Sequence, residues 1–321
     1  MDFREFTAGA DDDNRRLDRI IRKISGKENL SGLYKAIRKG LVKLNGKKTD
    51  VSEHVFKGDK IKVPEFLLQD ESSENKESCS VCAKKTDFQV VFQNEDLLVI
   101  NKPYDVPVHG SADSLEKSAV EFYREKFPGK KSISFAPGPL HRLDRKTTGL
   151  LAFSMSLAGA RWFSENIANH SIKKVYSAVF QGKITEAQKW TDFISKEYSE
   201  ESSFQTVKVV GTQLSEKYAV AETEIFPLKH FEYKGIPCTI ADIEIKTGRT
   251  HQIRAQADFL GFPLLGDSAY GGTEITAGQD FFLHAKTLFF PECRLPGLPR
   301  KLDAKPPFAF EKFCKTYLLN I

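Results

Sequence analysis

The stretch HRLDRKTTG at residues 141–149, followed by the apolar run LLAF at 150–153, decides how the rest of the chain is interpreted. The apolar run predicts a strand, and the polar residues then form a loop at its end. In that loop Asp144 lies between Arg142 and Arg145. At ~4 Å and an effective dielectric of ~20, one such cation stabilises the ionised carboxylate by roughly 4 kcal/mol. Asp144 is therefore expected to stay anionic, a poor proton acceptor suited to act as a nucleophile or charge stabiliser.

Alone, this motif does not establish a catalytic site. An isolated Arg–x–Asp–Arg is more often a solvated cluster of ion pairs. The kinase catalytic loop also has an Asp after His–Arg, with an Asn downstream. Here Leu143 separates Arg142 from Asp144, no Asn follows at that spacing, and no Gly-rich loop precedes the motif. The kinase interpretation is therefore set aside.

Hydrophobic patterning predicts a cytoplasmic protein with one large and one small domain. The 321 residues include 40% hydrophobic ones, which suits a packed core. No stretch reaches the ~18 consecutive apolar residues of a membrane-spanning helix. Residues 1–13 are acidic and lack the apolar core of a signal peptide. We expect no membrane partner.

The cysteines indicate neither a disulfide framework nor a metal site. Five is an odd number in a chain of this size. Cys79 and Cys82 form a lone Cys-x-x-Cys in polar surroundings, whereas a zinc site normally needs a second pair of ligands. The remaining three, at positions 238, 293 and 314, show no pairing in the sequence. No metal site is expected.

Basic charge is concentrated near the N-terminus. Residues 15–63 contain 15 Lys and Arg against 5 Asp and Glu, a net charge of +10, whereas the whole chain carries +5. Residues 1–14 carry −4 and are expected to form an acidic tail. A small region this basic predicts an acidic partner such as nucleic acid.

Two amphipathic helices are predicted in this basic region. Apolar residues at positions 17, 20, 21 and 24 predict the first, with Asp13 or Asn14 as its cap. The second is expected to begin with Ser31 as its cap and to end at Gly40. It displays three cations on one face: Lys35, Arg38 and Lys39.

Two turns follow the helices. Asn45–Gly46 predicts a hairpin, and Gly58–Asp59 predicts a turn before a strand at 60–63. Residues 15–66 thus form a compact module whose cations would neutralise phosphates. We expect it to bind RNA through the three cations of the second helix; a merely solvated charged face is the alternative.

The larger domain, residues 88–321, is expected to follow a flexible linker at 67–87, which is polar and nearly free of large apolar side chains. Periodicity predicts strands at 88–92, 97–100, 150–154, 173–180, 219–226 and 237–246. It predicts helices at 115–127, at 157–169, and from the segment 247–254 to a point before Gly261. Residues 183–217 are polar and are expected to be an irregular insertion.

These patterns predict an α+β fold with a mixed, largely antiparallel sheet flanked by helices and loops. No alternation of strand and helix with a Gly-rich phosphate loop is present. The start of the helix after residue 247 is dense in Arg249, Thr250 and His251, a composition that can gather anionic groups. A well-capped surface helix is the other interpretation. Tyr176, taken alone, is expected to be a core aromatic.

Six motifs together resemble those of the RluA family of pseudouridine synthases. Each is weak alone, but their order and spacing match the family. They are NKPYDVPVHG at 101–110, HRLDRKTTGLL at 141–151, KVYSA at 174–178, TGRTHQIR at 247–254, GFPLLGDSAYG at 261–271 and LHA at 283–285.

The N-terminal region resembles the α-L RNA-binding domain of a small-subunit ribosomal protein, and the whole chain therefore resembles the RluC branch of the family. The similarity rests on Arg16–Leu17–Asp18, Leu30–Ser31, Ile37–Arg38–Lys39–Gly40, Val42, Asn45–Gly46 and Gly58–Asp59–Lys60–Ile61.

The resemblance implies the pseudouridine synthase fold and its reaction. A uridine within RNA is isomerised: its base is detached from the ribose, turned, and rejoined through a ring carbon. Substrate and product contain the same atoms, so no cofactor and no metal are expected. The RluC branch implies large-subunit ribosomal RNA as the substrate, and the protein is expected to act as a monomer.

By the same resemblance Asp144 is the essential catalytic carboxylate, which attacks the ribose or the base or abstracts a sugar proton. Arg254 is similar to the arginine that pairs with this Asp. Tyr176 is similar to the tyrosine that stacks on the target base and takes part in the final removal of a proton from carbon. Stacking of this kind contributes ~1–3 kcal/mol per base.

Four further residues are implied in RNA binding. Arg142 matches the residue that fills the gap left by the flipped nucleotide, which helps to offset a flipping cost of a few kcal/mol. Arg249, Thr250 and His251 are expected to hold RNA or the geometry of the site. The chain has Ala255–Gln256 where the family usually has Val–His, which puts RNA contacts at this point in doubt.

Two other functions remain open from the sequence. One is a non-catalytic RNA-binding or ribosome-assembly protein that keeps the synthase fold, and the other is a synthase acting on tRNA. A catalytically inactive relative would be expected to lose at least one of Asp144, Tyr176 and Arg254, and all three are present.

Overall fold

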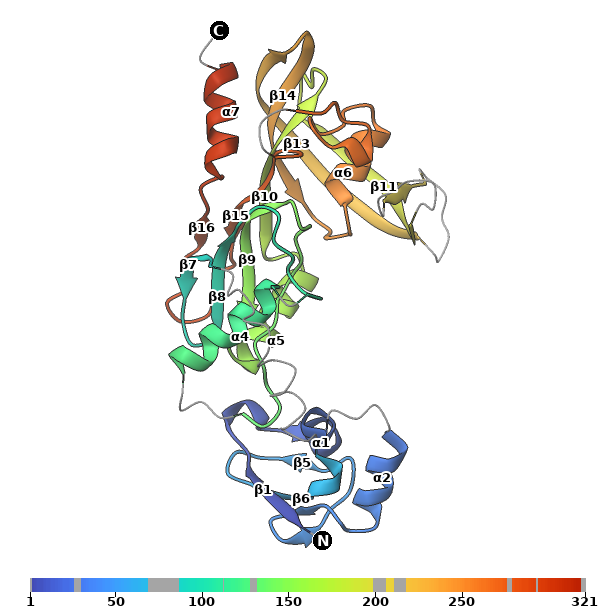
Figure 1. The fold of residues 1–321 in the computed structure, drawn as a ribbon, viewed down its shortest axis with the longest axis vertical. Helices are drawn as coiled ribbons and strands as arrows, with labels where there is room; N and C mark the ends of the chain where they lie inside the picture. The colour runs from blue at the N-terminus through green and yellow to red at the C-terminus, as the bar shows by residue number, and fades with distance from the viewer. Residues whose placement is uncertain are drawn as a thin grey trace.

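The computed structural model of the protein describes residues 2–25, 30–68, 87–111, 113–127, 132–198, 206–210, 218–275, 279–292 and 294–318. Within them a four-stranded sheet lies near the N-terminus and a ten-stranded sheet organises the larger part of the chain (Figure 1). Cys79, Cys82, Cys293 and most of the expected linker lie outside the described residues.

The N-terminal module, defined as residues 2–68, packs two helices against small sheets. The helices are α1 (Leu17–Ser25) and α2 (Leu30–Arg38). The four strands follow the order β1 (Phe3–Thr7), β6 (Lys60–Pro64), β3 (Lys43–Leu44) and β4 (Lys47–Lys48), and β2 (Arg15–Arg16) pairs with β5 (His54–Val55). Their apolar side chains form one buried core that includes Leu17, Ile20, Ile37 and Ile61. The predicted apolar faces of both helices therefore point inward.

The hairpin predicted at Asn45–Gly46 is confirmed. These residues join β3 to β4 and have φ values of 50° and 79°. A type I′ turn requires positive φ at both central positions, which Asn and Gly tolerate best. The predicted turn at Gly58–Asp59 also precedes a strand, β6.

The segment expected as an acidic tail is structured in part. Residues Phe3–Thr7 form β1, which pairs antiparallel with β6. The aromatic ring of Phe6 packs against the core of the module. The tail prediction is therefore wrong for this stretch, because pairing to β6 and burial of apolar surface outweigh the acidic composition.

Both helix caps predicted in the module are also wrong. Asp13 and Asn14 do not cap α1, because Arg15–Arg16 form a strand between them and the helix. Asp13 instead accepts the backbone N–H of Lys57 at 2.8 Å. Since α2 begins at Leu30, Ser31 lies inside the first turn of that helix.

The large sheet confirms the predicted mixed, largely antiparallel class. Its strands follow the order β12 (Val207–Val209), β11 (Gln188–Tyr198), β13 (Tyr218–Tyr233), β14 (Ile236–Ile245), β10 (Lys173–Gln181), β15 (Leu283–Phe289), β9 (Thr148–Ser154), β8 (Leu97–Lys102) and β7 (Gln89–Gln93). A short strand, β16 (Lys301–Asp303), also pairs with β15. Among the described strands, β15 and β9 run parallel and the other pairs run antiparallel.

The prediction of an irregular insertion at 183–217 is wrong. This stretch contains β11, which pairs with β13 from Gln188–Ile225 to Ser195–Tyr218, and the short β12 beyond it. Apolar residues alternate with polar ones through Trp190 and Ile194, and both of these side chains are buried. The alternation is interrupted by polar residues such as Asp192, which is itself buried, and this obscured the strand pattern.

Helices cover both faces of the large sheet. On one face α4 (Leu115–Lys126) and α6 (Gln252–Phe259) contribute to the same core as β8, β9, β10 and β14. On the other face α5 (Leu157–Ala168) packs on β8 and β9, and α7 (Phe308–Leu318) packs on β10 and β13. Within the described residues no helix has the length and apolar character needed to cross a bilayer.

Gly149 lets β9 approach β15 where the two run parallel. Its φ is +109°, and a Cβ at this position would lie 2.3 Å from the carbonyl oxygen of Ala285. Any other residue would push the strands apart at the point where the 141–148 loop enters the sheet. The glycine of the motif therefore fixes the height at which that loop leaves the sheet.

Candidate active site

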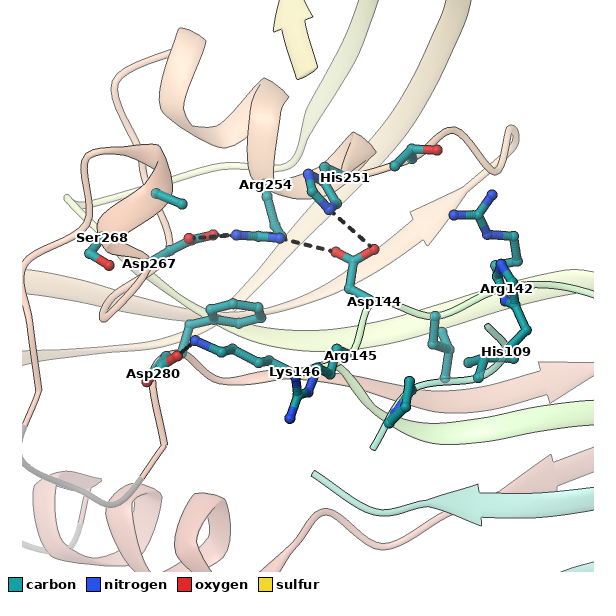
Figure 2. A pocket seen from close by; sticks show the side chains of 16 residues that line it. His109, Arg142, Asp144, Arg145, Lys146, His251, Arg254, Asp267, Ser268 and Asp280 are labelled. Carbon is teal, nitrogen blue, oxygen red and sulfur yellow. Dashed lines mark hydrogen bonds and ion pairs between the residues drawn. The ribbon is translucent and has the colours of Figure 1, made fainter. Parts of the chain in front are cut away.

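A cavity of about 530 Å³ opens on the sheet face that carries α6 (Figure 2). Its lining comes from the segments 107–109, 142–146, 250–254, 267–269 and 280–281. The volume falls in the range of small-molecule sites, ~300–1,000 Å³. Four of the six sequence motifs, which are far apart in the chain, therefore contribute residues to one concave surface.

Asp144 directs its carboxylate into this cavity from the loop before β9 (Figure 2). Its Oδ2 lies 3.3 Å from Nη1 of Arg254, and its Oδ1 lies 3.8 Å from Nε2 of His251. The Asp144 side chain is 22% exposed, so a ligand can reach it. The structure thus brings together three residues that were selected from two separate motifs.

Arg254 is a buried cation with two carboxylate partners. Besides Asp144 it contacts Asp267, whose oxygens lie 2.6 Å from Nε and 2.8 Å from Nη2. Burial alone would lower the pKa of Arg254, but the hydrogen bonds and charge of Asp267, followed by the charge of Asp144, raise that pKa above its ordinary value. Arg254 therefore remains a permanent positive charge beside Asp144.

His251 precedes α6 in a left-handed backbone conformation, with φ of 51°. Nδ1 of its ring lies 2.9 Å from the hydroxyl of Tyr270. Burial lowers the pKa of His251, although the charge of Asp144 opposes this. At neutral pH the ring is uncharged, so its 3.8 Å approach to Asp144 is not an ion pair. Residues other than glycine in this conformation are strained and often occur at functional sites.

Tyr176 lies at the floor of the site, in β10, opposite Ile243 of β14 and Ala285 of β15. It is 6% exposed and lines a small recess together with Asp144, Arg142 and Arg254. Burial, reinforced by the charge of Asp144, raises the pKa of Tyr176 well above its ordinary value. Its phenol is therefore neutral, which fits a stacking surface better than a proton acceptor.

The other predicted RNA contacts near the cavity lie at its edge. Arg142 is exposed and lines both the cavity and the recess. Arg249 lines the recess, and its Nε donates to the backbone oxygen of Val220 at 3.0 Å. Thr250 lines the cavity beside His251. These side chains surround Asp144 without contacting it directly.

Lys35, Arg38 and Lys39 are not part of the cavity. They are exposed on α2 in the N-terminal module, whereas the described lining residues fall between positions 107 and 281. They form a separate cationic face, as their helical spacing predicted.

The sequence interpretation did not single out two buried residues of the site. Lys102 is 1% exposed, and its Nζ donates to the backbone oxygens of Pro103 at 2.9 Å and Arg145 at 2.6 Å. Asp267 is 2% exposed and binds Arg254. Both lie within recognised motifs, at 101–110 and 261–271, and a charged residue inside an otherwise apolar or proline-rich stretch was the available signal.

Gln256 does not face the RNA side of the site. It is fully buried; its amide nitrogen lies 2.7 Å from Asp192, and its oxygen accepts the hydroxyl hydrogen of Thr223 at 2.6 Å. The departure from Val–His at 255–256 therefore concerns the attachment of α6 to β11 and β13. Doubt about substrate contacts at this position is removed.

The described residues include no group of three or more His, Cys, Asp or Glu side chains placed to hold a metal ion. The site instead consists of one reachable carboxylate, a buried guanidinium, a neutral imidazole and a neutral phenol. Such a set can hold an anion at a defined point, contact a planar base and stabilise developing positive charge.

The chain matches the family model described as RNA pseudouridylate synthase over residues 96–258. Among curated proteins it is 29% identical to ribosomal large subunit pseudouridine synthase D of Vibrio parahaemolyticus, over 80% of this chain and 73% of the relative. It is 25% identical to ribosomal large subunit pseudouridine synthase C of Vibrio cholerae, over 91% of this chain and 89% of the relative.

Solved structures agree on the fold. Human RNA pseudouridylate synthase domain containing 4 superposes with a TM-score of 0.56 at 22% identity, covering 70% of this chain and 91% of that one. Human RNA pseudouridylate synthase domain containing 1 gives a TM-score of 0.51 at 26% identity, covering 72% and 94%. The matched family segment includes Asp144, Tyr176, His251 and Arg254.

Proposed function

Because the chain belongs to the RNA pseudouridylate synthase family, we propose that it isomerises uridines of large-subunit ribosomal RNA to pseudouridine, with Asp144 as the catalytic carboxylate. The chain is thus an RNA pseudouridine synthase, and the proposal concerns its substrate and its working residues. The observation that carries it is the reachable Asp144 carboxylate, paired at 3.3 Å with the buried Arg254 inside the cavity.

The reaction requires cleavage of the bond between C1′ of the ribose and N1 of uracil, rotation of the base, and bond formation between C1′ and C5. The proton on C5 is then lost, and N1 ends with a proton, so the atoms balance without a cofactor or a metal. An anionic Asp144 can attack the sugar or the base, or take a sugar proton. Arg254 keeps its carboxylate ionised and oriented in each case.

Tyr176 and Arg142 are proposed to manage the flipped nucleotide. The ring of Tyr176 borders the recess beside Asp144, where a uracil could stack on it. Arg142 is exposed at the rim, where a guanidinium can replace the flipped base in the RNA stack. Removal of the C5 proton by Tyr176 is disfavoured by its raised pKa, so we assign the ring a stacking role.

The substrate assignment rests on two supports. Relatives that cover most of this chain are named as ribosomal large subunit synthases. The basic region at residues 15–63, with its net charge of +10, supplies cations outside the cavity for a long RNA. We propose that residues 15–66 are the α-L-type RNA-binding domain, with Lys35, Arg38 and Lys39 among its phosphate contacts, and that the catalytic domain acts as a monomer.

A nucleoside analysis tests this function. Unmodified large-subunit ribosomal RNA is incubated with the wild-type protein or with Asp144→Asn, digested, and separated chromatographically, because uridine and pseudouridine have equal mass. We expect a pseudouridine peak with the wild type alone. A peak with both proteins would refute the role of Asp144. A wild-type peak with tRNA, and none with ribosomal RNA, would refute the substrate class.

A further inference from the structure

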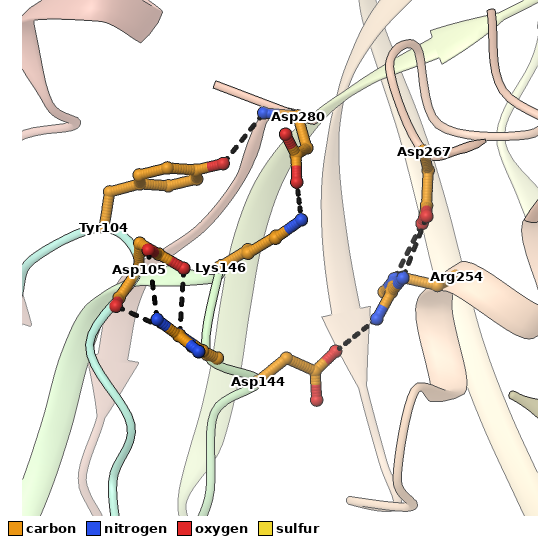
Figure 3. A network of polar contacts seen from close by, with 8 residues as sticks. Tyr104, Asp105, Asp144, Lys146, Arg254, Asp267 and Asp280 are labelled. Atoms are coloured by element: carbon orange, nitrogen blue, oxygen red, sulfur yellow. Dashed lines mark hydrogen bonds and ion pairs between the residues drawn. The ribbon is translucent and has the colours of Figure 1, made fainter. Parts of the chain in front are cut away.

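The guanidinium of Arg254 is divided unequally between two carboxylates (Figure 3). Asp267 takes the edge formed by Nε and Nη2, at 2.6 and 2.8 Å. Asp144 receives only Nη1, at 3.3 Å. Charge-assisted bonds are strongest at ~2.7–2.9 Å and in the two-point geometry. Asp267 is therefore the principal partner of Arg254, and Asp144 is the weaker one.

Aromatic rings keep the guanidinium in this arrangement. Its central carbon lies 4.8 Å from the ring centroid of Tyr270 and 4.6 Å from that of Phe281. Asp267 is 2% exposed, so it cannot turn into water without leaving a buried cation partly unpaired. The turn that carries Asp267 is fixed as well, because the N–H of Gly272 donates to its backbone oxygen at 2.8 Å.

We propose that Asp267 is a positioning residue for the isomerisation, and that it acts through Arg254. By occupying the two-point edge, Asp267 leaves a single N–H for Asp144. Oδ1 of Asp144 is then not engaged by the guanidinium and faces the cavity near His251. Without Asp267 the same fork would pair with both oxygens of Asp144, the geometry that arginine and carboxylates prefer. The reacting oxygen would then be held by the enzyme itself.

This inference rests on the proposed catalytic role of Asp144. It differs from a simple role in folding because it predicts an effect on turnover rather than on RNA binding. Loss of correct orientation at a reacting group lowers kcat, whereas contacts made equally with substrate and transition state change KM.

The first test is Asp267→Asn, measured by pseudouridine formation at saturating and limiting RNA. The amide keeps the size of the side chain but removes its charge and replaces one acceptor with a donor that faces the guanidinium. We expect kcat to fall about 100-fold with KM unchanged. Asp258→Asn is the matched control, since Asp258 is an exposed carboxylate on the same helix as Arg254, and it should keep wild-type kcat.

The second test is a double-mutant cycle with Arg254→Lys, which keeps a cation but lacks the fork. If Asp267 acts through the fork, Asp267→Asn should lower kcat far less in the Arg254→Lys background than in the wild type. An equal fall in both backgrounds would overturn the inference, as would wild-type kcat in Asp267→Asn alone.

A folding defect is recognised by thermal unfolding and by RNA affinity, and Asp267→Ser, which keeps one acceptor oxygen, then replaces Asp267→Asn. If neither variant folds, Asp267 is a structural residue and the positioning role is overturned. Activity retained by Asp144→Asn would instead refute the proposed function, so the two failures give different results.

Discussion

The carboxylate of Asp12 lies 2.6 Å from the hydroxyl oxygen of Ser134, which is 122 positions later in the chain. The same carboxylate accepts the backbone N–H groups of Ile133 and Ser134, at 3.0 and 3.1 Å, and is fully buried. Asp11 accepts the N–H of Leu157 at the start of α5, at 2.8 Å. A buried carboxylate is tolerated when its oxygens are hydrogen-bonded in this way. The N-terminal module is thus docked on the catalytic part through directed bonds.

Replacing Asp12 by Ala should release this docking. The change leaves the buried donors of Ile133 and Ser134 without their acceptor, which we expect to cost about 3 kcal/mol. Small-angle scattering should show a larger radius of gyration, and denaturant unfolding should start at lower concentration. Asp13→Ala is the control, because Asp13 is exposed and its carboxylate binds within the module, at Lys57. Equal behaviour of the two variants would contradict the docking.

Lys102 predicts a pH dependence of stability. Burial lowers the pKa of Lys102 from 10.5 to about 7, although the charges of Asp144 and Asp105 oppose this. In the unfolded chain the ordinary value applies, so between those two pKa values the unfolded state binds more protons than the folded state. The contribution of Lys102 to stability therefore rises with pH across that window and is constant below it.

The measurement compares urea unfolding of the wild type and Lys102→Met at pH 7 and pH 9.5. Methionine cannot titrate, so the free energy of unfolding of the variant, relative to the wild type, should fall as the pH increases. Since other groups titrate equally in both proteins, the difference isolates Lys102. The same difference at both pH values would show that the amine is not perturbed by its burial.

Tyr176 should tolerate loss of its hydroxyl better than loss of its ring. A stacked base is worth ~1–3 kcal/mol, and phenylalanine keeps the π surface. We expect Tyr176→Leu to lower kcat/KM by about 5- to 150-fold relative to Tyr176→Phe. Because burial raises the pKa of Tyr176, the wild type and Tyr176→Phe should have parallel pH–rate profiles between pH 6 and 9. Equal activity of the Phe and Leu variants would exclude stacking.

The sequence predicted those parts of the structure in which neighbouring residues carry the signal. Alternation and helical periodicity located β8, β9, α4 and α5 to within a few residues. It failed for β11, where a buried Asp192 satisfied by Gln256 imitates the polarity of a loop. Such a pair depends on a helix more than sixty positions away, and local composition cannot reveal it.

The site shows the same division. Asp144, Tyr176 and Arg254 were selected as members of recognised motifs, and the structure brings them to adjoining concave surfaces. Asp267 was missed although it lies in a motif, because its importance comes from sharing Arg254 with Asp144. That relationship between two carboxylates exists only after the chain has folded.

The cations of α2 should govern the salt dependence of RNA binding. Each phosphate contact contributes about −0.7 to −0.9 to the slope of log K against log salt concentration. Replacing Lys35, Arg38 and Lys39 together by Gln should therefore make the slope shallower by roughly 2 units. Conversion of bound RNA should continue, since these residues lie outside the cavity.

The matched control replaces three exposed lysines near the C-terminus, at positions 305, 312 and 315, by Gln. It removes the same charge from the whole protein, so a slope that depends on net charge alone would change equally in both variants. A change confined to the α2 variant would identify that helix as the phosphate-binding face. Equal slopes for the α2 variant and the wild type would show that RNA does not contact it.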